Sequence, residues 1–469
     1  MQRDLGDFQT PRELADLVFG VLDRIGVRGS LILEPTCGRG SFLEAARERH
    51  AEAILLGIEI QPDHVRFARA LVPTARIIEG DIFDPGLDLT RLVTLAPPGP
   101  LLVVGNPPWI TVGELGRLDS KHQPPRRTDL GLRGFDALTG RSNFDLAEAV
   151  WYRLFDALKG RDATLALLCK ESVALRVMAT ATERRLPIKA ASFHRIDSRR
   201  WFGASVSAGL FRVELGRTGE VVSIDHHPTL MSEKHDRRIG TVDGVSVHDL
   251  DAFCEVAEYF GSPVSRWRQG IKHDAADVLE LRREGAHWIN GYGDRVDVEP
   301  SSLYPLLKSV DLNDARRRAD RALIVPQLRL GDSTEALAES HPRLWRYLQS
   351  HSRRFEARRS RIYAGRTPFS IFGVGPYSFQ PHKVAVSGLH VAPRFQAIEP
   401  VEGRPVVFDD TCYFLPVDSS DSAHRVVAAL ESESIRRLLA AVVAPGSKRK
   451  VTKRLLDRID HERLLAAAT

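Results

Sequence analysis

Short apolar runs alternate with segments of helical periodicity over residues 8 to about 216. In the first helical segment, Leu14, Val18 and Val21 recur at intervals of three or four residues. The apolar runs predict strands at 31–33, 54–60, 76–78, 101–104 and 163–168. Residues 190–196 and 206–215 are expected to close the sheet as a hairpin. This alternation predicts an α/β domain whose parallel sheet carries helices on both faces.

Thr10-Pro11-Arg12-Glu13 carries two signals for the start of the first helix. A Thr followed by Glu three residues later is a capping box, and Pro is favoured at the first helical position. We therefore expect the Thr10 hydroxyl to cap the first turn.

The pattern changes after residue 216. Short mixed segments with frequent Gly, Pro and aromatic residues continue to about residue 415, and residues 422–466 have a helical pattern. We predict a catalytic domain over 1–216, a connector over 217–261 and an α+β domain over 262–469.

Composition narrows the class of protein. The chain has 469 residues, of which 43% are hydrophobic and 27% charged, as in ordinary globular domains. No apolar run approaches the roughly 20 residues of a membrane span, and no signal segment follows Met1. The four cysteines are far apart and lack metal-ligand spacing, which predicts reduced thiols in the cytoplasm and no metal site. A net charge of +5 is compatible with a polyanionic partner.

A glycine-rich turn follows the first predicted strand, in Glu34-Pro35-Thr36-Cys37-Gly38-Arg39-Gly40. Gly38 and Gly40 allow the backbone to turn tightly and approach a ligand closely. The dinucleotide-binding pattern would have a third glycine at position 43, where this chain has Leu. The carboxylate of Glu34 would repel a phosphate and suits a cation, such as the amino-acid portion of S-adenosylmethionine.

Acidic residues also follow the next two strands. Glu59 ends the second strand, where a carboxylate can accept hydrogen bonds from ribose hydroxyls. Asp81 follows the third strand, where it can accept from an adenine amino group while Ile82 packs on the ring. Each acid alone is compatible with a solvated strand end or a turn. Three successive strands that each end in an acid predict a nucleoside-binding site.

Asn106-Pro107-Pro108-Trp109 follows the fourth strand. The two prolines exclude helix and remove two backbone donors, which leaves an amide oxygen, exposed carbonyls and an aromatic face. This set suits a planar substrate that carries an NH2 group, although the motif alone is also compatible with an ordinary turn.

The order of these motifs resembles the γ-type amino-methyltransferases, which modify N6 of adenine in DNA. The resemblance rests on Phe8–Pro11, Glu34–Phe42, Glu59, Asp81 and Asn106–Trp109, and it covers about residues 1–215. Residues 262–465 resemble, more loosely, the target-recognition domain of Taq-type enzymes. The resemblance implies a Rossmann-like class I methyltransferase domain and a second domain that reads DNA.

The resemblance also implies roles for individual residues. S-adenosylmethionine would be bound by Thr10, Glu34, Cys37, Gly38, Glu59, Ile60, Asp81 and Ile82. Asn106, Pro107 and Trp109 would act on the flipped-out adenine, with Pro108 and Phe202 also contacting the base. Trp109 stands where the commonest family form has Tyr. Trp201 is the second choice for the aromatic assigned to Phe202.

Basic residues predict where nucleic acid would bind. Residues 113–143 form a long segment without periodicity that contains six basic residues, which fits a lid or a solvated loop. Aromatic residues are interleaved with basic clusters in the C-terminal part. The basic clusters are Arg316–Arg318, Arg321, Arg353–Arg354, Arg358–Arg359, Arg361, Arg366 and Lys448–Lys450. They are expected to contact phosphates or to form solvated helix faces.

We therefore expect an adenine-specific DNA methyltransferase in a restriction–modification or phage-defence system. Its expected partners are double-stranded DNA and a separately encoded restriction endonuclease, and we expect a nucleoid-associated monomer. The alternatives are methylation of RNA adenine or of protein glutamine, and a non-catalytic specificity subunit of a defence complex.

Overall fold

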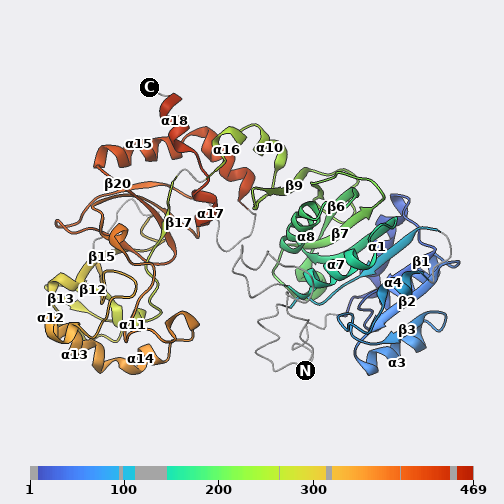
Figure 1. Ribbon diagram of the computed structural model, residues 1–469, viewed down its shortest axis with the longest axis horizontal. Coiled ribbons are helices and arrows are strands. Elements are labelled where there is room, and N and C mark those ends of the chain that lie inside the picture. Colours follow the sequence, from blue (N-terminus) through green and yellow to red (C-terminus); the bar gives the residue numbers. More distant parts are fainter. Residues whose placement is uncertain are drawn as a thin grey trace. The chain divides into compact units, whose positions relative to one another are not determined.

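The computed structural model describes residues 9–94, 99–110, 145–262, 265–312, 320–390, 392–443 and 451–467. The chain forms two compact units, Met1–Asp251 and Ala252–Thr469 (Figure 1). The segment 113–143, the clusters Arg316–Arg318 and Lys448–Lys450, and Phe8 lie outside the described residues. No helix in the described part of the chain is long and apolar enough to cross a bilayer.

The first unit is built on a ten-stranded sheet with the order β10-β9-β8-β6-β7-β5-β4-β1-β2-β3. Its strands are β1 Leu31–Glu34, β2 Ile54–Glu59, β3 Arg76–Glu79, β4 Leu101–Gly105, β5 Ala163–Lys170, β6 Ile188–Ile196, β7 Ala208–Leu215, β8 Ile224–His227, β9 Arg237–Val242 and β10 Val245–Val247. Strands β3, β2, β1, β4 and β5 are parallel, and β7 pairs antiparallel with both β5 and β6. The predicted parallel sheet and its closing hairpin are confirmed.

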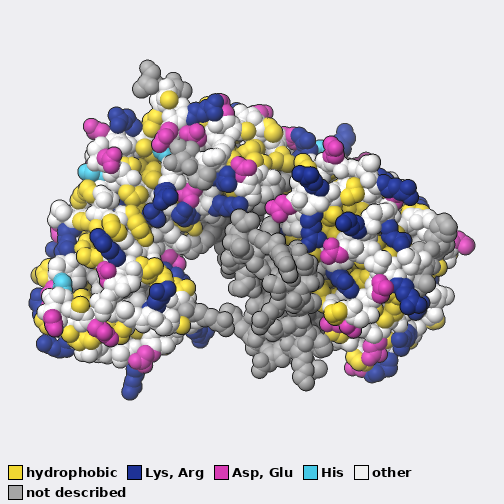
Figure 2. All heavy atoms as spheres, viewed as in Figure 1, with side chains coloured by type: hydrophobic (Ala, Val, Ile, Leu, Met, Phe, Trp, Pro, Cys, Tyr) yellow, Lys and Arg dark blue, Asp and Glu magenta, His cyan; other side chains and the backbone are white. Residues whose placement is uncertain are grey.

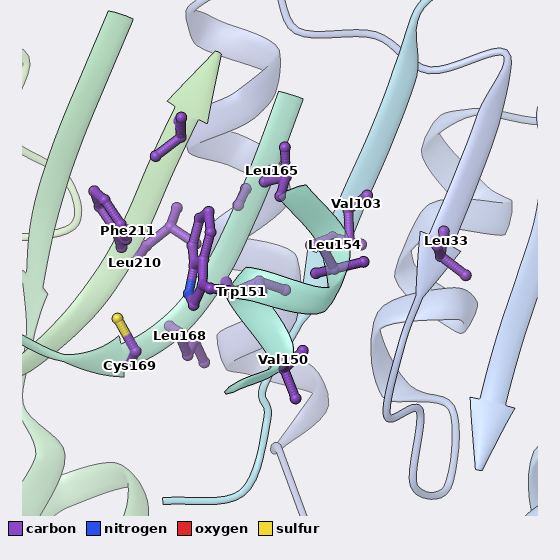
Figure 3. Close-up of a cluster of buried hydrophobic side chains, with 14 of the residues drawn as sticks. Leu33, Val103, Val150, Trp151, Leu154, Leu165, Leu168, Cys169, Leu210 and Phe211 are labelled. Carbon is purple, nitrogen blue, oxygen red and sulfur yellow. The ribbon is translucent and has the colours of Figure 1, made fainter. Parts of the chain in front are cut away.

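Helices flank this sheet (Figure 1). They are α1 Arg12–Arg24, α2 Ser41–Arg49, α3 Pro62–Leu71, α4 Leu89–Thr94, α7 Leu146–Ala157, α8 Glu171–Glu183 and α9 Ser198–Phe202. Helix α10, Leu250–Cys254, crosses the boundary between the two units. Every residue of β1 and β4 is buried, as expected for central strands covered on both faces. Figure 3 shows the core between α7 and the strands. There Trp151 is fully buried, with its ring 4.7 Å from that of Phe211.

Two sequence-based expectations for this unit need correction. The capping box is wrong, because α1 has Pro11 at its N-cap position and no side-chain cap bond. The hydroxyl of Thr10 instead accepts a hydrogen bond from Asn106. Residues 217–251 also belong to the first unit, and their strands β8, β9 and β10 extend its sheet beyond β6. They therefore do not form the connector expected over 217–261.

The second unit is α+β, as predicted. It contains a four-stranded sheet, β11-β20-β17-β18, and a six-stranded sheet, β14-β13-β12-β16-β15-β19. The strands are β11 Arg268–Gln269, β12 Glu280–Glu284, β13 His287–Ile289, β14 Arg295–Val296, β15 Leu303–Leu307, β16 Arg321–Ile324, β17 His382–Ser387, β18 Gln396–Ile398, β19 Val407–Phe408 and β20 Cys412–Val417. All described pairings are antiparallel except that of β15 with β19.

The helices of the second unit are short. They are α11 Ala276–Leu279, α12 Leu337–Ser340, α13 Pro342–Ser350, α14 Ser352–Glu356, α15 Ser420–Leu430, α16 Glu433–Val442, α17 Lys453–Leu456 and α18 His461–Ala467, with 3-10 turns at Ala257–Tyr259, Pro300–Ser302, Arg361–Tyr363 and Pro376–Phe379. The helical pattern predicted over 422–466 is divided among α15 to α18. Ser419, Ser432 and Thr452 cap three of these helices through their side chains.

A candidate active site at the carboxyl ends of the parallel strands

A cavity of about 270 Å³ opens at the point where the order of the parallel strands reverses. Strand β1 lies there between β2 and β4, and open α/β sheets bind ligands at this kind of position. All eight residues predicted for the cofactor lie on the cavity wall. They are Thr10, Glu34, Cys37, Gly38, Glu59, Ile60, Asp81 and Ile82. Asn106 and Pro108 also line the cavity.

The glycine-rich turn leaves space that a side chain would fill. Gly38 has a φ of +50° and Gly40 has a φ of +87°, both in the left-handed region that favours glycine. A Cβ atom at Gly38 would lie 2.7 Å from Oε1 of Gln9. The same Gln9 oxygen accepts a hydrogen bond from the Arg39 N–H at 3.0 Å. The backbone of the turn therefore forms one side of the cavity directly.

Glu34 is the most buried acid of the site, with 3% of its surface exposed. One carboxyl oxygen is bonded to the backbone of Leu43, and Oε2 has no hydrogen-bond partner among the residues that the structure describes. Burial raises the pKa of Glu34 well above its usual value, and the nearby charge of Glu59 raises it further. A buried carboxyl oxygen without a partner is costly, so a cationic ligand would be stabilised here. The α-amino group of S-adenosylmethionine fits this requirement.

Glu59 and Asp81 are held by backbone N–H groups. Glu59 accepts from Gly38 through Oε2 and from Gln61 through Oε1, each at 2.8 Å. Asp81 accepts from the Phe83 N–H at 2.9 Å. A carboxylate oxygen has two lone pairs, so these bonds fix each side chain and leave acceptor capacity for hydroxyl or amino groups. The pair suits a ribose at Glu59 and an adenine at Asp81.

Cys37 contributes bulk to the cavity wall. Its side chain is 4% exposed, and burial raises the pKa of the thiol. A thiol that stays protonated is a poor nucleophile, so the burial of Cys37 fits a role in shaping the cavity wall.

Asn106 connects the acceptor motif to the start of the chain. Its amide Nδ2 donates to the Thr10 hydroxyl at 3.2 Å. This bond ties two segments that are distant in the sequence and orients the amide at the carboxyl end of β4. Two predicted site residues, Asn106 and Thr10, are therefore directly coupled.

The two aromatic residues that were predicted to contact the base lie side by side. The rings of Trp109 and Phe202 meet edge to face, with centroids 5.1 Å apart. Trp109 is only 8% exposed, and its indole N–H donates to the Leu168 carbonyl at 3.3 Å. Pro107 is buried, and neither it nor the aromatic pair lines the cavity. Trp201, the second choice, lies instead under the guanidinium of Arg200 at 4.5 Å.

Two charged residues beside the Asn106–Trp109 motif were not predicted from the sequence. Lys170 ends β5, and Asp145 precedes α7. The ammonium of Lys170 donates to Asp145 at 2.7 Å and to the Trp109 carbonyl at 3.2 Å. Lys170 could have been identified from its place at the end of the fifth parallel strand, because the carboxyl ends of these strands all meet at one edge of the sheet.

Several basic residues of the second unit have structural partners. Arg321 pairs with Asp311, and Arg354 pairs with Asp277. Arg358 donates to three backbone carbonyls, those of Phe355, His273 and Ser370. These partners orient the three arginines in the folded protein, and phosphate contact by them stays a prediction. Arg353, Arg359 and Arg366 are exposed.

The interleaved aromatics are largely part of the core. Phe355 is buried, and Trp345 and Tyr347 pack against the same hydrophobic cluster. Arg359 and Arg366 line a cavity of about 1050 Å³ together with aromatic side chains. Figure 2 shows basic side chains on this unit with acidic ones among them, so the visible face is not uniformly basic.

The sheet order, the glycine-rich turn and the acids at the strand ends define a class I S-adenosylmethionine-dependent methyltransferase domain. A type IIL restriction–modification enzyme, MmeI, solved in complex with DNA, has the same fold over 95% of this chain, with a TM-score of 0.58 and 12% identity. The chain spans 64% of that enzyme's length. No protein-family model matches the chain.

Sequence relatives identify the family. The chain is 34% identical over 467 residues to the type II methyltransferase M.NspV of Nostoc sp., covering 98% of this chain and 96% of the relative. It is 32% identical over 118 residues to the type II methyltransferase M.TthHB8I of Thermus thermophilus, covering 24% of each chain. The chain belongs to the type II methyltransferases, and its cofactor is S-adenosylmethionine.

Proposed function

We propose that this protein is a site-specific DNA methyltransferase that methylates N6 of a flipped-out adenine in a restriction–modification system. The observation that carries the proposal is the position of Asn106. Its amide lines the same cavity as Glu34, Glu59 and Asp81, and Thr10 orients it. A planar amino group held at Asn106 would therefore face the space where the cofactor binds.

The chemistry requires acceptors, because the lone pair of an adenine amino group is delocalised into the ring. Bound S-adenosylmethionine supplies a methyl group on a sulfonium sulfur. The Asn106 amide oxygen and the Pro107 carbonyl would accept hydrogen bonds from the two N6 protons. These bonds favour a pyramidal nitrogen whose lone pair is available for in-line attack, so the protein acts mainly by positioning and electrostatics.

The remaining predicted residues hold the two ligands. Glu34 would pair with the α-amino group of the cofactor, Glu59 with its ribose hydroxyls and Asp81 with its adenine. The target base must leave the duplex, which costs a few kcal/mol. Stacking against an aromatic side chain contributes roughly 1–3 kcal/mol per base, so Trp109 and Phe202 would offset part of that cost. Trp109 is largely buried, whereas the adjoining Pro108 lines the cavity.

We assign target recognition to the second unit. The structural neighbour MmeI, which was solved in complex with DNA, supports DNA as the substrate. Arg353, Arg359 and Arg366 are exposed members of the basic clusters and are assigned to phosphate contacts.

Asn106→Ala tests the proposal. We expect methyl transfer from radiolabelled S-adenosylmethionine to duplex DNA to be abolished, because one of the two acceptors is lost. We expect the cofactor Kd to stay within about threefold, because the binding energy comes mainly from the three acids. Transfer at the wild-type rate would refute the assignment, and loss of cofactor binding would show that Asn106 belongs to the cofactor site.

A further inference from the structure

The ion pair between Lys170 and Asp145 lies directly behind the acceptor motif. Lys170 is the last residue of β5, and its Nζ donates to Asp145 Oδ2 at 2.7 Å and to the Trp109 carbonyl at 3.2 Å. The side chains of Lys170 and Asp145 are 24% and 4% exposed, respectively. The ammonium therefore joins a buried carboxylate to the backbone of the motif.

Asp145 has a second role that fixes its orientation. It is the N-cap residue of α7, and its Oδ1 accepts from the Ala147 N–H at 3.2 Å. Burial raises the pKa of Asp145, and the charge of Lys170 opposes that effect. One carboxylate oxygen is thus committed to the helix and the other to Lys170.

The motif needs anchors outside its own backbone. Pro107 and Pro108 have no N–H groups, so two of its four residues cannot donate backbone hydrogen bonds. Strand β5 holds Trp109 twice, through the indole N–H to Leu168 and through the carbonyl to Lys170. Thr10 holds the other end at Asn106. The segment is therefore fixed at both ends by side-chain contacts.

We propose that Lys170, oriented by Asp145, is a positioning residue for methyl transfer. Its ammonium holds the Trp109 carbonyl and thereby sets the position of the Asn106 amide and the Pro107 carbonyl relative to the cofactor cavity. This inference rests on the proposed function, in which the Asn106–Trp109 segment receives the methyl acceptor. A displacement of about 1 Å in such a segment is enough to lower a rate by about 100-fold.

A purely structural role for the ion pair makes a different prediction. Lys170→Met alone leaves Asp145 buried without its partner, which is destabilising, and the variant can fail to fold. The double variant Lys170→Met with Asp145→Asn removes both charges and keeps an Asn at the N-cap position, where it is favoured. A neutral pair of this kind is often as stable as the buried ion pair it replaces.

The decisive measurement is therefore the kcat of the double variant. We expect its melting temperature to be close to that of the wild type, its kcat to fall by roughly 10- to 100-fold and its KM for S-adenosylmethionine to change by less than about threefold. Lys170→Arg, which keeps a cationic donor, should recover part of the lost rate. If the double variant regains both stability and wild-type kcat, the ion pair is structural and the proposal is wrong.

Lys189→Met is the matched control. Lys189 also pairs with an aspartate, Asp162, at 2.8 Å, but both side chains are about half exposed and contact no part of the motif. We expect it to leave kcat unchanged. An equal loss of rate in Lys189→Met would contradict a specific role for Lys170.

A second readout does not depend on the identity of the methyl acceptor. In protein labelled with 5-fluorotryptophan, the Trp109 resonance can be assigned by its absence in Trp109→Phe. We expect it to shift or broaden in the double variant and to stay unchanged in Lys189→Met. An unchanged Trp109 resonance overturns the proposal. A shifted resonance with no wild-type transfer to DNA supports the positioning contact and refutes the proposed substrate instead.

Discussion

Replacing Glu34 by Gln should stabilise the apoprotein and weaken cofactor binding at the same time. Burial raises the pKa of Glu34, so the folded protein holds the proton more tightly than the unfolded chain does. Glu34 therefore adds to the free energy of unfolding at pH values below the pKa that it has in the unfolded chain. This contribution is lost as the pH rises toward the pKa of Glu34 in the folded protein. Gln keeps the shape of the side chain and carries no charge to bury.

The substitution is expected to raise stability and to lower cofactor affinity, and the size of each change can be given separately. Gln removes the charge of Glu34 but keeps a polar group at the same place, so we expect a gain of about 1–3 kcal/mol at pH 8, which is the order of the cost of an unpaired buried group. For a unit of 251 residues, this corresponds to a rise in Tm of roughly 2–4 °C per kcal/mol. Removing one partner of a buried charged hydrogen bond costs about 2–5 kcal/mol, so the Kd for S-adenosylmethionine should weaken by roughly 30-fold or more.

Calorimetry measures both quantities. Scanning calorimetry at pH 5 and pH 8 gives the Tm, and the stabilising effect should be larger at pH 8. Titration calorimetry gives the Kd. Glu79→Gln is the control, because Glu79 ends β3, a parallel strand of the same sheet, but is exposed and does not line the cavity. A Glu34→Gln variant that melts below the wild type, or binds the cofactor as tightly, would refute the assigned role.

Two further substitutions test the site and the second unit. Gly38→Ala adds a Cβ at a φ of +50° and 2.7 Å from Oε1 of Gln9, so titration should show cofactor affinity at least about 10-fold weaker. Gly160→Ala is the control, because Gly160 has a φ of +76° and open space around it; this variant should lose stability and keep its affinity for the cofactor. Equal losses of cofactor affinity in the two variants would contradict the placement of Gly38 in the cofactor site. Lys383 is fully buried, and burial lowers its pKa to about 7. Above pH 7 the unfolded chain therefore binds more protons than the folded protein does, so stability rises with pH up to about 10. Lys383→Met should therefore raise the Tm at pH 7 by a few degrees, net of the lost bond to the Val406 carbonyl, and the gain should shrink toward pH 10; a constant difference would contradict this explanation.

The parallel part of the sheet and its ligand site could be predicted from the sequence. Strands such as β1 and β4 are continuous apolar runs, which central parallel strands require. The carboxyl ends of these strands meet at one edge, so Glu34, Glu59 and Asp81 were expected to converge. Their convergence follows from topology and needs no knowledge of side-chain contacts.

Strand β8 illustrates what local patterns cannot reveal. Its sequence, Ile224–His227, is polar, yet His226 is fully buried because Asp236 and Arg237 bond to its ring. Burial of such a segment depends on partners from another strand, and no periodicity shows them. The partners of Arg354 and Arg358 could not be predicted for the same reason, since they lie far away in the sequence.

Long-read sequencing of DNA from a host that expresses this protein tests the central claim most directly, because it reports the modified base and its sequence context together. We predict N6-methyladenine at one short motif in cells with the wild-type chain, and its absence in cells with the Asn106→Ala variant. Unmodified DNA, a modified cytosine, or methylation that persists in the variant would contradict the proposal that Asn106 holds a DNA adenine.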